Sequence, residues 1–501
     1  MDSFTSTVKP QTIQLECFDA IGTLCSVSIG YWYENSANDT QDAFMPPKIM
    51  ERSFYKTLEE FPILSGRLKA DSNNRLYVEI DKNDLNKPAY TDTCCDLEYS
   101  TMRDSGFNIH KLPIDLRNES GVPAPSGMFS GDITPAHFRI IRFKNNSGVL
   151  VYADIAHYIT DGYGYSRFMN RWAEISRWMQ QPQDASATPL PERKFIHDRS
   201  IHNGYRSKQT TALEEKEIKA FTTSTAFTRW LSWITPAKRG KILKTRLQLS
   251  GSNTCCFFHI SPKTIEDLRA LVQKHAPEGT RYSIHDTISA FVIIVVGQAV
   301  EKARSNWWSK SVTSVTRVLS GNKLGKPTDL PVTTDVNIRW RSSNPDAKHY
   351  MGNMNVGKSI TVPQKLIQVE PTDESLSELA LKIHQAVASA TELRAGQIGY
   401  LLNKATDSYI WPIWCGATER NRMSISNQSR FAHYEVDFGA GMPSMVRHAI
   451  NPLPNSVYVM PANPKTGGGY MIEMHISPTT EAQLVKNNNW MKLVDSYQSW
   501  Q

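Results

Sequence analysis

Apolar residues alternate along one stretch in the first third of the chain. Val149, Val151, Ala153, Ile155 and His157 are spaced by two, so on a strand they share one face. Four apolar side chains on this face would pack inward and hold the main chain rigid. The alternation therefore predicts a strand that ends on a histidine with a fixed backbone, which is how a catalytic base is usually presented.

Strand and helix periodicities recur along the whole chain. In the first half they predict strands at 12–34, 75–80, 137–143 and 149–157, and helices at 47–61 and 168–179. Residues 84–136 are rich in Pro, Gly, Asp and Ser and are predicted to be irregular, with short strands at most. The second half is predicted to contain strands at 254–260, 332–340, 354–362, 423–426 and 469–476, and helices at 262–275, 287–304, 374–394 and 478–486. Both halves mix strands and helices, which favours an α/β (α+β) fold with two lobes.

The length of 501 residues favours two domains of ordinary size. We expect an N-terminal lobe at residues 1–205, a crossover segment at 206–250 and a C-terminal lobe at 251–501. The crossover is predicted because residues 180–250 begin with a Pro/Gln/Ala linker and contain a basic cluster at 238–246. This cluster could meet the phosphates of a nucleotide-like cofactor, and a solvated lysine-rich loop explains it as well.

The charges are nearly balanced, with 56 Lys and Arg against 49 Asp and Glu, for a formal net charge of +7. Such a charge is too diffuse for a nucleic-acid binder; it suits an enzyme of an anionic small molecule, and equally a mixed solvated surface. The seven cysteines are odd in number and form no C-x-x-C, so neither a disulfide framework nor a zinc site is predicted. The first residues lack the features of a secretory signal, and the apolar stretch 288–300 is too short to span a bilayer. We therefore expect a cytoplasmic protein that does not enter a membrane.

Several familiar catalytic motifs are absent from the sequence. It contains no G-x-S-x-G elbow, no G-x-G-x-x-G after a strand and no H-E-x-x-H. Residues 321–327 resemble a phosphate-binding loop but are one residue short, and Pro327 stands where Ser or Thr should follow. His157 and Asp161 have the spacing of two metal ligands on a helix, but here the histidine ends a strand and the aspartate precedes a glycine. The pair is better suited to acid–base work.

An Asp-Gly turn, Asp161-Gly162, follows the histidine closely. A short turn with Asp161 directed back into the fold would fix the loop that orients His157. We therefore predict that Asp161 is structural and paired with an arginine, and that it is not the third member of a catalytic triad.

A second motif, D-F-G-x-G, lies near the end of the chain and contains Asp437, Gly439 and Gly441. It is a tight glycine turn closed by Pro443 and, taken alone, indicates a structural loop. Protein kinases also carry D-F-G, but their H-R-D-L-x-x-x-N loop and glycine-rich strand are absent from this sequence.

The two motifs together resemble the BAHD family of acyl-CoA-dependent acyltransferases, in which H-x-x-x-D-G precedes D-F-G-x-G at a similar separation. Weaker similarities to that family are spread over the chain, at residues 61–68, 283–290, 336–341 and 350–353. The resemblance implies two lobes of the chloramphenicol-acetyltransferase type joined by a long crossover. It further implies a solvent channel with His157 near its middle, acyl-CoA as co-substrate, and no metal or bound prosthetic group.

The resemblance also implies roles for individual residues. His157 would be the general base for acyl transfer from acyl-CoA to a hydroxyl or amine, and Asp161 would pair with Arg339. Asp437 would anchor its own loop. The tetrahedral intermediate needs a hydrogen-bond donor, and the candidates at the motif are Asn427, Gln428 and Ser429.

Two positions depart from the family pattern and bear on substrate range. Gln428 falls where many members carry a tryptophan, and Ala440 falls where plant members carry another. Ala156 replaces the second histidine of peptide-synthetase condensation domains, which argues against that class. We expect a monomeric O-acyltransferase that acts on a small-molecule alcohol. An alcohol acceptor is preferred to a polyamine because the sequence contains no acidic cluster that must bind a polycation. An N-acyltransferase and an inactive homologue that binds coenzyme A are the alternatives.

Overall fold

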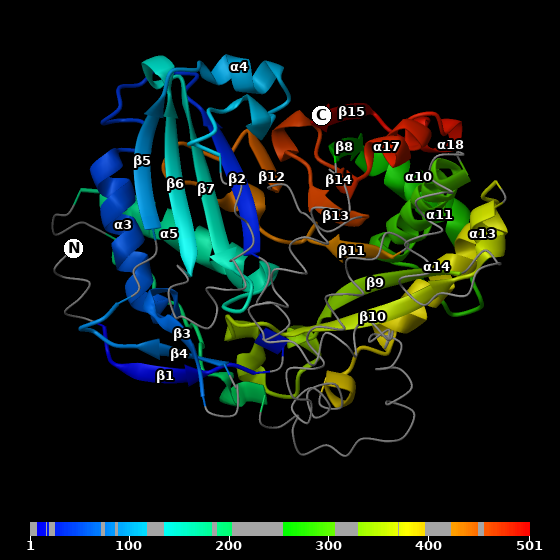
Figure 1. The fold of residues 1–501 in the computed structure, drawn as a ribbon, viewed down its shortest axis with the longest axis horizontal. Helices are drawn as coiled ribbons and strands as arrows, with labels where there is room; N and C mark the ends of the chain where they lie inside the picture. The colour runs from blue at the N-terminus through cyan, green and yellow to red at the C-terminus, as the bar shows by residue number, and fades with distance from the viewer. Residues whose placement is uncertain are drawn as a thin grey trace. The chain divides into compact units, whose positions relative to one another are not determined.

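The computed structural model describes residues 8–16, 18–19, 26–71, 76–85, 89–117, 135–182, 188–202, 254–305, 329–368, 370–395, 422–448 and 455–500 (Figure 1). The chain forms two compact units. Unit 1 takes its described residues from 1–204, 342–354 and 431–450, and unit 2 takes them from 205–341, 355–430 and 451–501.

Unit 1 is built on a five-stranded sheet in the order β12-β2-β7-β6-β5. Figure 1 shows β5, β6, β7 and β2 side by side in this order. The strands are β2 (Ser26–Glu34), β5 (Ala89–Cys95), β6 (Ala136–Phe143), β7 (Gly148–Ala156) and β12 (Met445–His448). β7 is antiparallel to both of its neighbours, and all nine of its residues are buried. The predicted strand is therefore confirmed, and His157 is the first residue after it.

Two helices cover one face of this sheet, α3 (Pro47–Glu60) and α5 (Gly162–Gln180). Phe138 of β6 contacts Phe54 of α3 and Trp172 of α5, with ring centroids 4.7 and 5.8 Å apart. The indole Nε1 of Trp172 also donates to the main-chain carbonyl of Met50 at 3.2 Å, so the two helices are held to each other. Phe168, Trp172 and Ile175, three apolar residues of the helix predicted at 168–179, are buried on α5.

Smaller elements complete unit 1. A three-stranded sheet has the order β1-β4-β3, and α4 follows β5. Their bounds are β1 (Gln11–Gln14), β3 (Arg67–Ala70), β4 (Leu76–Ile80) and α4 (Tyr99–Asp104). Residues 84–136 were predicted to be irregular, with short strands at most. They contain the strand β5, which pairs in parallel with β6 over seven residues, and also the helix α4, which was not predicted.

Unit 2 contains a seven-stranded sheet in the order β10-β9-β11-β13-β14-β8-β15. Its strands are β8 (Thr254–Ile260), β9 (Leu330–Asn337), β10 (Asn355–Val362), β11 (Met423–Asn427), β13 (Ser456–Pro461), β14 (Tyr470–Ile476) and β15 (Ser496–Trp500). Its helices are α10 (Pro262–Gln273), α11 (Ile284–Ser305), α13 (Gln364–Gln368), α14 (Asp373–Ala388), α17 (Pro478–Leu484) and α18 (Asn488–Met491). Strand β9 ends at Asn337, so Arg339 lies in a 3₁₀ turn (Arg339–Arg341) and not on a strand as predicted.

Helix α11 is longer than the apolar stretch recognised in the sequence. Within the described parts of the chain it is the helix whose length and composition would allow it to cross a membrane, over Ile284–Ala303. However, 83% of that apolar window is buried inside the protein, in the core cluster of unit 2. A core helix passes the same test of length and composition, so this helix is weak support for a membrane span.

The two units differ from the simple division expected at residues 205 and 251. Residues 342–354 and 431–450 were placed in the C-terminal lobe, but they pack in unit 1. The reason is pairing that periodicity cannot reveal: β12 is hydrogen-bonded to β2, and Tyr33 donates to the carbonyl of Val436 at 2.6 Å. The predicted crossover at 206–250, its basic cluster and the loop at 321–327 lie outside the described residues.

Candidate active site

His157 begins the loop that connects β7 to α5. It is half-buried, and its ring nitrogen Nδ1 is buried without a hydrogen-bond partner among the residues that the structure describes. Its main-chain carbonyl accepts a hydrogen bond of 2.7 Å from Nδ2 of Asn353. The histidine is therefore fixed through its backbone, on one side by the paired strand and on the other by this amide.

Asp161 caps the helix that follows. It is fully buried, and its Oδ1 accepts from the N–H of Gly164 at 3.1 Å, as an N-cap residue does. Its Oδ2 accepts from the N–H of Met354, also at 3.1 Å. Both carboxylate oxygens thus bind main-chain donors, which is the geometry of a turn brace. The predicted pairing with Arg339 remains a prediction, because Arg339 belongs to unit 2.

The helix start after Asp161 requires a glycine at position 164. Gly162 is the first residue of α5. At Gly164, a Cβ atom would lie 2.1 Å from Oγ1 of Thr160 and 2.3 Å from the carbonyl oxygen of Met351, so no larger residue fits. The sequence reasoning did not single out Gly164, whose only signal was its place in the first turn after the Asp-Gly pair.

The D-F-G-x-G loop lies in unit 1 and is closed by its own aspartate. Oδ1 of Asp437 accepts from the N–H groups of Gly439 and Gly441, both at 2.8 Å. These glycines have φ values of 98° and 81°, which favour glycine over other residues. Arg177 donates to the main-chain carbonyl of Asp437, and Gln180 donates to that of Phe438 at 2.7 Å. The loop is therefore tied to the last turns of α5.

The candidate oxyanion donors lie at the end of β11 in unit 2, and the structure distinguishes them. Oδ1 of Asn427 accepts from both the N–H and the hydroxyl of Ser429, at 3.0 and 2.7 Å. Gln428 is 7% exposed, and its Oε1 has no hydrogen-bond partner within the described ranges. The hydroxyl proton of Ser429 is therefore already engaged inside the protein.

A histidine that the sequence reasoning did not consider completes this cluster. Nδ2 of Asn427 lies 3.2 Å from Nδ1 of His285, near the start of α11. Burial lowers the pKa of His285; the negative charge of Asp286 opposes this shift and the positive charge of Arg430 adds to it, and the net lowering favours the neutral ring. Because an amide nitrogen only donates, Nδ1 accepts and the ring proton resides on Nε2. This contact holds the Asn427 side chain in the orientation that receives Ser429.

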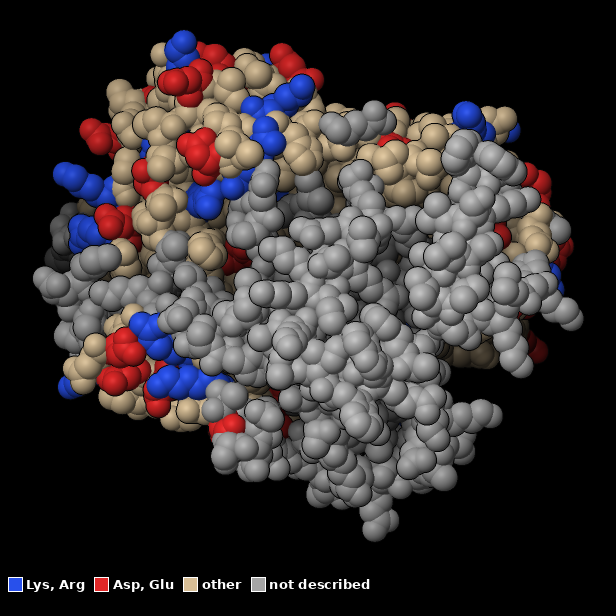
Figure 2. Space-filling view, in the orientation of Figure 1, with Lys and Arg blue, Asp and Glu red and all other residues tan. Residues whose placement is uncertain are grey.

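Three further features of the described residues bear on a possible site: metal ligands, surface charge and cysteines. In those ranges no group of three or more His, Cys, Asp or Glu side chains could hold a metal ion. Figure 2 shows basic and acidic side chains interspersed over the described part of the visible face, without a single basic field there. Cys94, Cys95 and Cys256 are free thiols, and Sγ of Cys255 lies 3.8 Å from Nε2 of His475.

A model of the transferase family matches residues 131–492, a range that contains both H-x-x-x-D-G and D-F-G-x-G. The chain belongs to this family, the BAHD-type acyltransferases. It is an acyl-CoA-dependent acyltransferase by descent, and its mixed α/β fold is that of the two-lobed chloramphenicol-acetyltransferase-like enzymes predicted from the sequence.

Individual relatives of this BAHD protein are distant in sequence but nearly complete in coverage. Stemmadenine O-acetyltransferase of Catharanthus roseus is 21% identical over 98% of this chain and 96% of its own. The crystal structure of F. graminearum TRI101 with coenzyme A and T-2 mycotoxin has a TM-score of 0.70 at 16% identity, covering 98% of this chain and 100% of that chain. The crystal structure of vinorine synthase has a TM-score of 0.54 at 15% identity, covering 98% of both chains. At these identities the solved structures establish the fold.

Proposed function

We propose that the protein transfers an acyl group from acyl-CoA to a hydroxyl group of a small-molecule acceptor, with His157 as general base. The observation that carries this proposal is the presentation of His157, which is half-buried on a main chain held from both sides. Two relatives support the choice of substrates. One is named an O-acetyltransferase, and another was solved with coenzyme A and a small-molecule toxin.

The proposed mechanism uses one residue for both proton transfers. Nδ1 of His157 is the buried ring nitrogen, which leaves Nε2 to take the proton of the acceptor hydroxyl. As the proton leaves, the acceptor oxygen forms a bond to the thioester carbonyl carbon and a tetrahedral oxyanion results. The C–S bond then breaks, and the imidazolium returns the proton to the leaving thiolate. A positioned base of this kind contributes about 10² to 10⁴ in rate.

We assign the oxyanion donor to Gln428 in preference to Ser429. The support is the hydrogen bonding at the end of β11, where the hydroxyl of Ser429 already donates to Asn427; on Gln428 the donor would be the side-chain NH₂ group. Loss of one oxyanion donor costs about 10² to 10³ in kcat.

The test is a panel of acyl-CoA thioesters offered with alcohol acceptors and, in parallel, with the matched amines, scored by release of free thiol. We expect release that depends on an alcohol, and a fall of at least about 10² in kcat for His157→Ala. The partly exposed His275 of unit 2 supplies a control, because His275→Ala should behave as the wild type. Release with amines alone would make the protein an N-acyltransferase. Binding of coenzyme A without any release would identify an inactive homologue.

A further inference from the structure

The loop that carries His157 is held by a residue almost 200 positions away. Nδ2 of Asn353 donates to the carbonyl of His157 at 2.7 Å and to Oδ1 of Asp19 at 2.9 Å. Asn353 is 3% exposed and Asp19 is fully buried. The amide therefore bridges the catalytic loop to a buried carboxylate from the start of the chain.

An arginine approaches the same carboxylate from its other oxygen. Nε of Arg199 donates to Oδ2 of Asp19 at 3.2 Å, and its NH2 group donates to the carbonyl of Ile159 at 2.7 Å. We call Asp19, Arg199 and Asn353 the carboxylate clamp. Its two donors each bind one oxygen of Asp19 and one carbonyl of the loop, so the carbonyls of residues 157 and 159 are fixed relative to a single buried group.

The two residues before Asn353 add further contacts to the loop of His157. Thr160 donates through Oγ1 to the carbonyl of Met351 at 2.7 Å. A Cβ atom at Gly352 would lie 2.2 Å from the hydroxyl oxygen of Tyr350 and 2.8 Å from Cζ of Arg199, so a larger residue here would displace one of these side chains. Residues 350–353 therefore pack against the clamp and the catalytic loop together.

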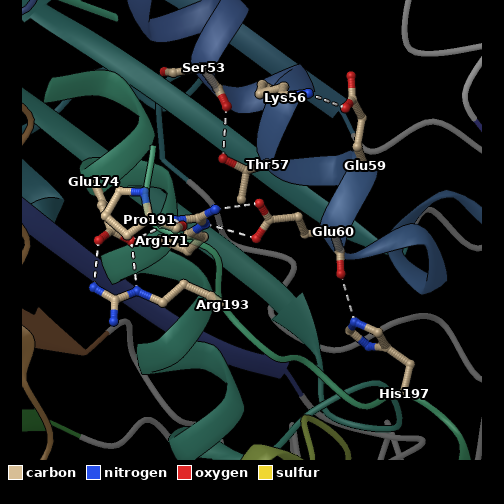
Figure 3. A network of polar contacts seen from close by, with 10 residues as sticks. All are labelled: Ser53, Lys56, Thr57, Glu59, Glu60, Arg171, Glu174, Pro191, Arg193 and His197. Carbon is tan, nitrogen blue, oxygen red and sulfur yellow. Dashed lines mark hydrogen bonds and ion pairs between the residues drawn. The ribbon is translucent and has the colours of Figure 1, made fainter. Parts of the chain in front are cut away.

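The segment that precedes Arg199 of the clamp is anchored to helices α5 and α3. Figure 3 shows Arg171 of α5 bound to the carboxylate of Glu60 of α3 and to the carbonyl of Pro191. It also shows Nε2 of His197 at the main-chain carbonyl of Glu60, at 2.8 Å. Because Arg199 donates to the carbonyl of His197 at 2.8 Å, its position is tied to the helix layer of unit 1.

A buried ion pair is a poor source of stability, because removing both charges from water costs about as much as their attraction returns. What the clamp supplies is geometry, since both of its donors end on the loop of the proposed base. We propose that Asn353, held by Asp19 and Arg199, is a positioning residue for His157. This inference rests on the proposed role of His157 as general base.

The first test is Asn353→Ala, which removes both bridging hydrogen bonds and leaves the ion pair. We expect kcat to fall by about 10², as for a misplacement of a catalytic group by about 1 Å, with KM for acyl-CoA changed less than about twofold. A purely structural residue would lower the yield of folded protein and leave the kcat of the folded fraction unchanged. Wild-type kcat in folded Asn353→Ala protein would overturn the proposal.

The second test exchanges the two groups in Asp19→Asn/Asn353→Asp. The exchange keeps one carboxylate and one amide in the clamp, but the carboxylate now at position 353 cannot donate to the carbonyl of His157. We expect the unfolding midpoint to recover relative to Asp19→Asn, while kcat stays as low as in Asn353→Ala. Recovery of wild-type kcat by the exchange would show that the bond to His157 is dispensable.

A third measurement does not depend on turnover. Diethyl pyrocarbonate modifies neutral histidines, and its rate at His157 can be followed by mass spectrometry of the peptide. We expect Asn353→Ala to change this rate several-fold and to leave the rate at His275 unchanged. If the wild type released no thiol from any thioester, the proposed function would fail. The modification rate would still test whether Asn353 positions His157. An unchanged rate at His157 would refute it.

Discussion

Asp161 accepts a hydrogen bond of 3.1 Å from the main-chain N–H of Met354, 193 residues further along the chain. Its other oxygen caps α5 at Gly164. One carboxylate therefore joins the start of the helix after the loop of His157 to a distant segment of unit 1, and each of its two oxygens accepts from a different main-chain N–H.

This arrangement predicts the effect of Asp161→Asn. An asparagine keeps one acceptor oxygen and places an NH₂ group against the second donor, so one buried N–H loses its partner. We expect the free energy of unfolding to fall by about 1 to 3 kcal/mol, measured by urea denaturation. Asp42→Asn, at an exposed aspartate of the same unit, should be neutral. A folded Asp161→Asn protein of wild-type stability and full activity would contradict the brace.

The two candidate oxyanion donors are predicted to behave differently. Gln428→Leu keeps the size of the side chain and removes its amide, and we expect kcat to fall by about 10² to 10³. Ser429→Ala removes a hydroxyl that already donates to Asn427, and we expect less than about a tenfold loss. Steady-state kinetics on both variants with the same acyl-CoA provide the comparison. A larger loss for Ser429→Ala would reverse the assignment.

Local patterns in the sequence predicted the elements that present the candidate base. The alternation from Val149 to His157 located β7 to within one residue, because a strand buried on both faces and paired on both edges must be apolar at its core positions. The stripe at Phe168 and Trp172 located α5 in the same way. In each case the information lies within one helix or one strand.

Long-range contacts were beyond the reach of such patterns. Nothing in the spacing of residues 431–450 indicates that β12 pairs with β2, or that Asp19 receives both Arg199 and Asn353. Asn353 did belong to a short segment that resembles the family, but its amide acquires meaning only from the carbonyl of His157. Hydrogen bonds between distant segments depend on the folded path of the chain, and composition and periodicity do not encode them.

The D-F-G-x-G loop yields a prediction about two glycines in similar conformations. Both have positive φ, so alanine at either should cost about 1 to 2 kcal/mol of stability. At Gly439 an added Cβ would also lie 2.5 Å from the side-chain amide of Gln180, whereas at Gly441 it would meet nothing within 4 Å. Chemical denaturation should therefore rank Gly439→Ala as the more destabilised variant.

A double variant separates the two contributions at Gly439. Gln180→Ala removes the obstructing amide, so adding Gly439→Ala to this background should cost only the backbone strain, about 1 to 2 kcal/mol. Equal costs of Gly439→Ala in both backgrounds would show that Gln180 moves aside freely.

The last prediction concerns pH and rests on His433, which is fully buried in unit 1 with Nδ1 3.0 Å from the hydroxyl of Tyr31. Burial, with a smaller contribution from the neighbouring His448, lowers the pKa of His433 from 6.5 to about 3. In the unfolded chain the imidazole gains a proton as the pH falls below 6.5, while in the folded protein it stays neutral. The contribution of His433 to stability is therefore fully present above this pH and is lost progressively as the pH falls towards 3.

The expected slope is about 1.4 kcal/mol per pH unit from this one group between pH 6 and 4. His433→Gln cannot ionise but can still hydrogen-bond Tyr31, so its free energy of unfolding should fall less steeply over the same range. Urea denaturation of both proteins at pH 7, 6 and 5 measures the difference, in which the carboxylates common to both proteins cancel. Parallel curves would mean that His433 takes up its proton in the folded state as readily as in the unfolded chain.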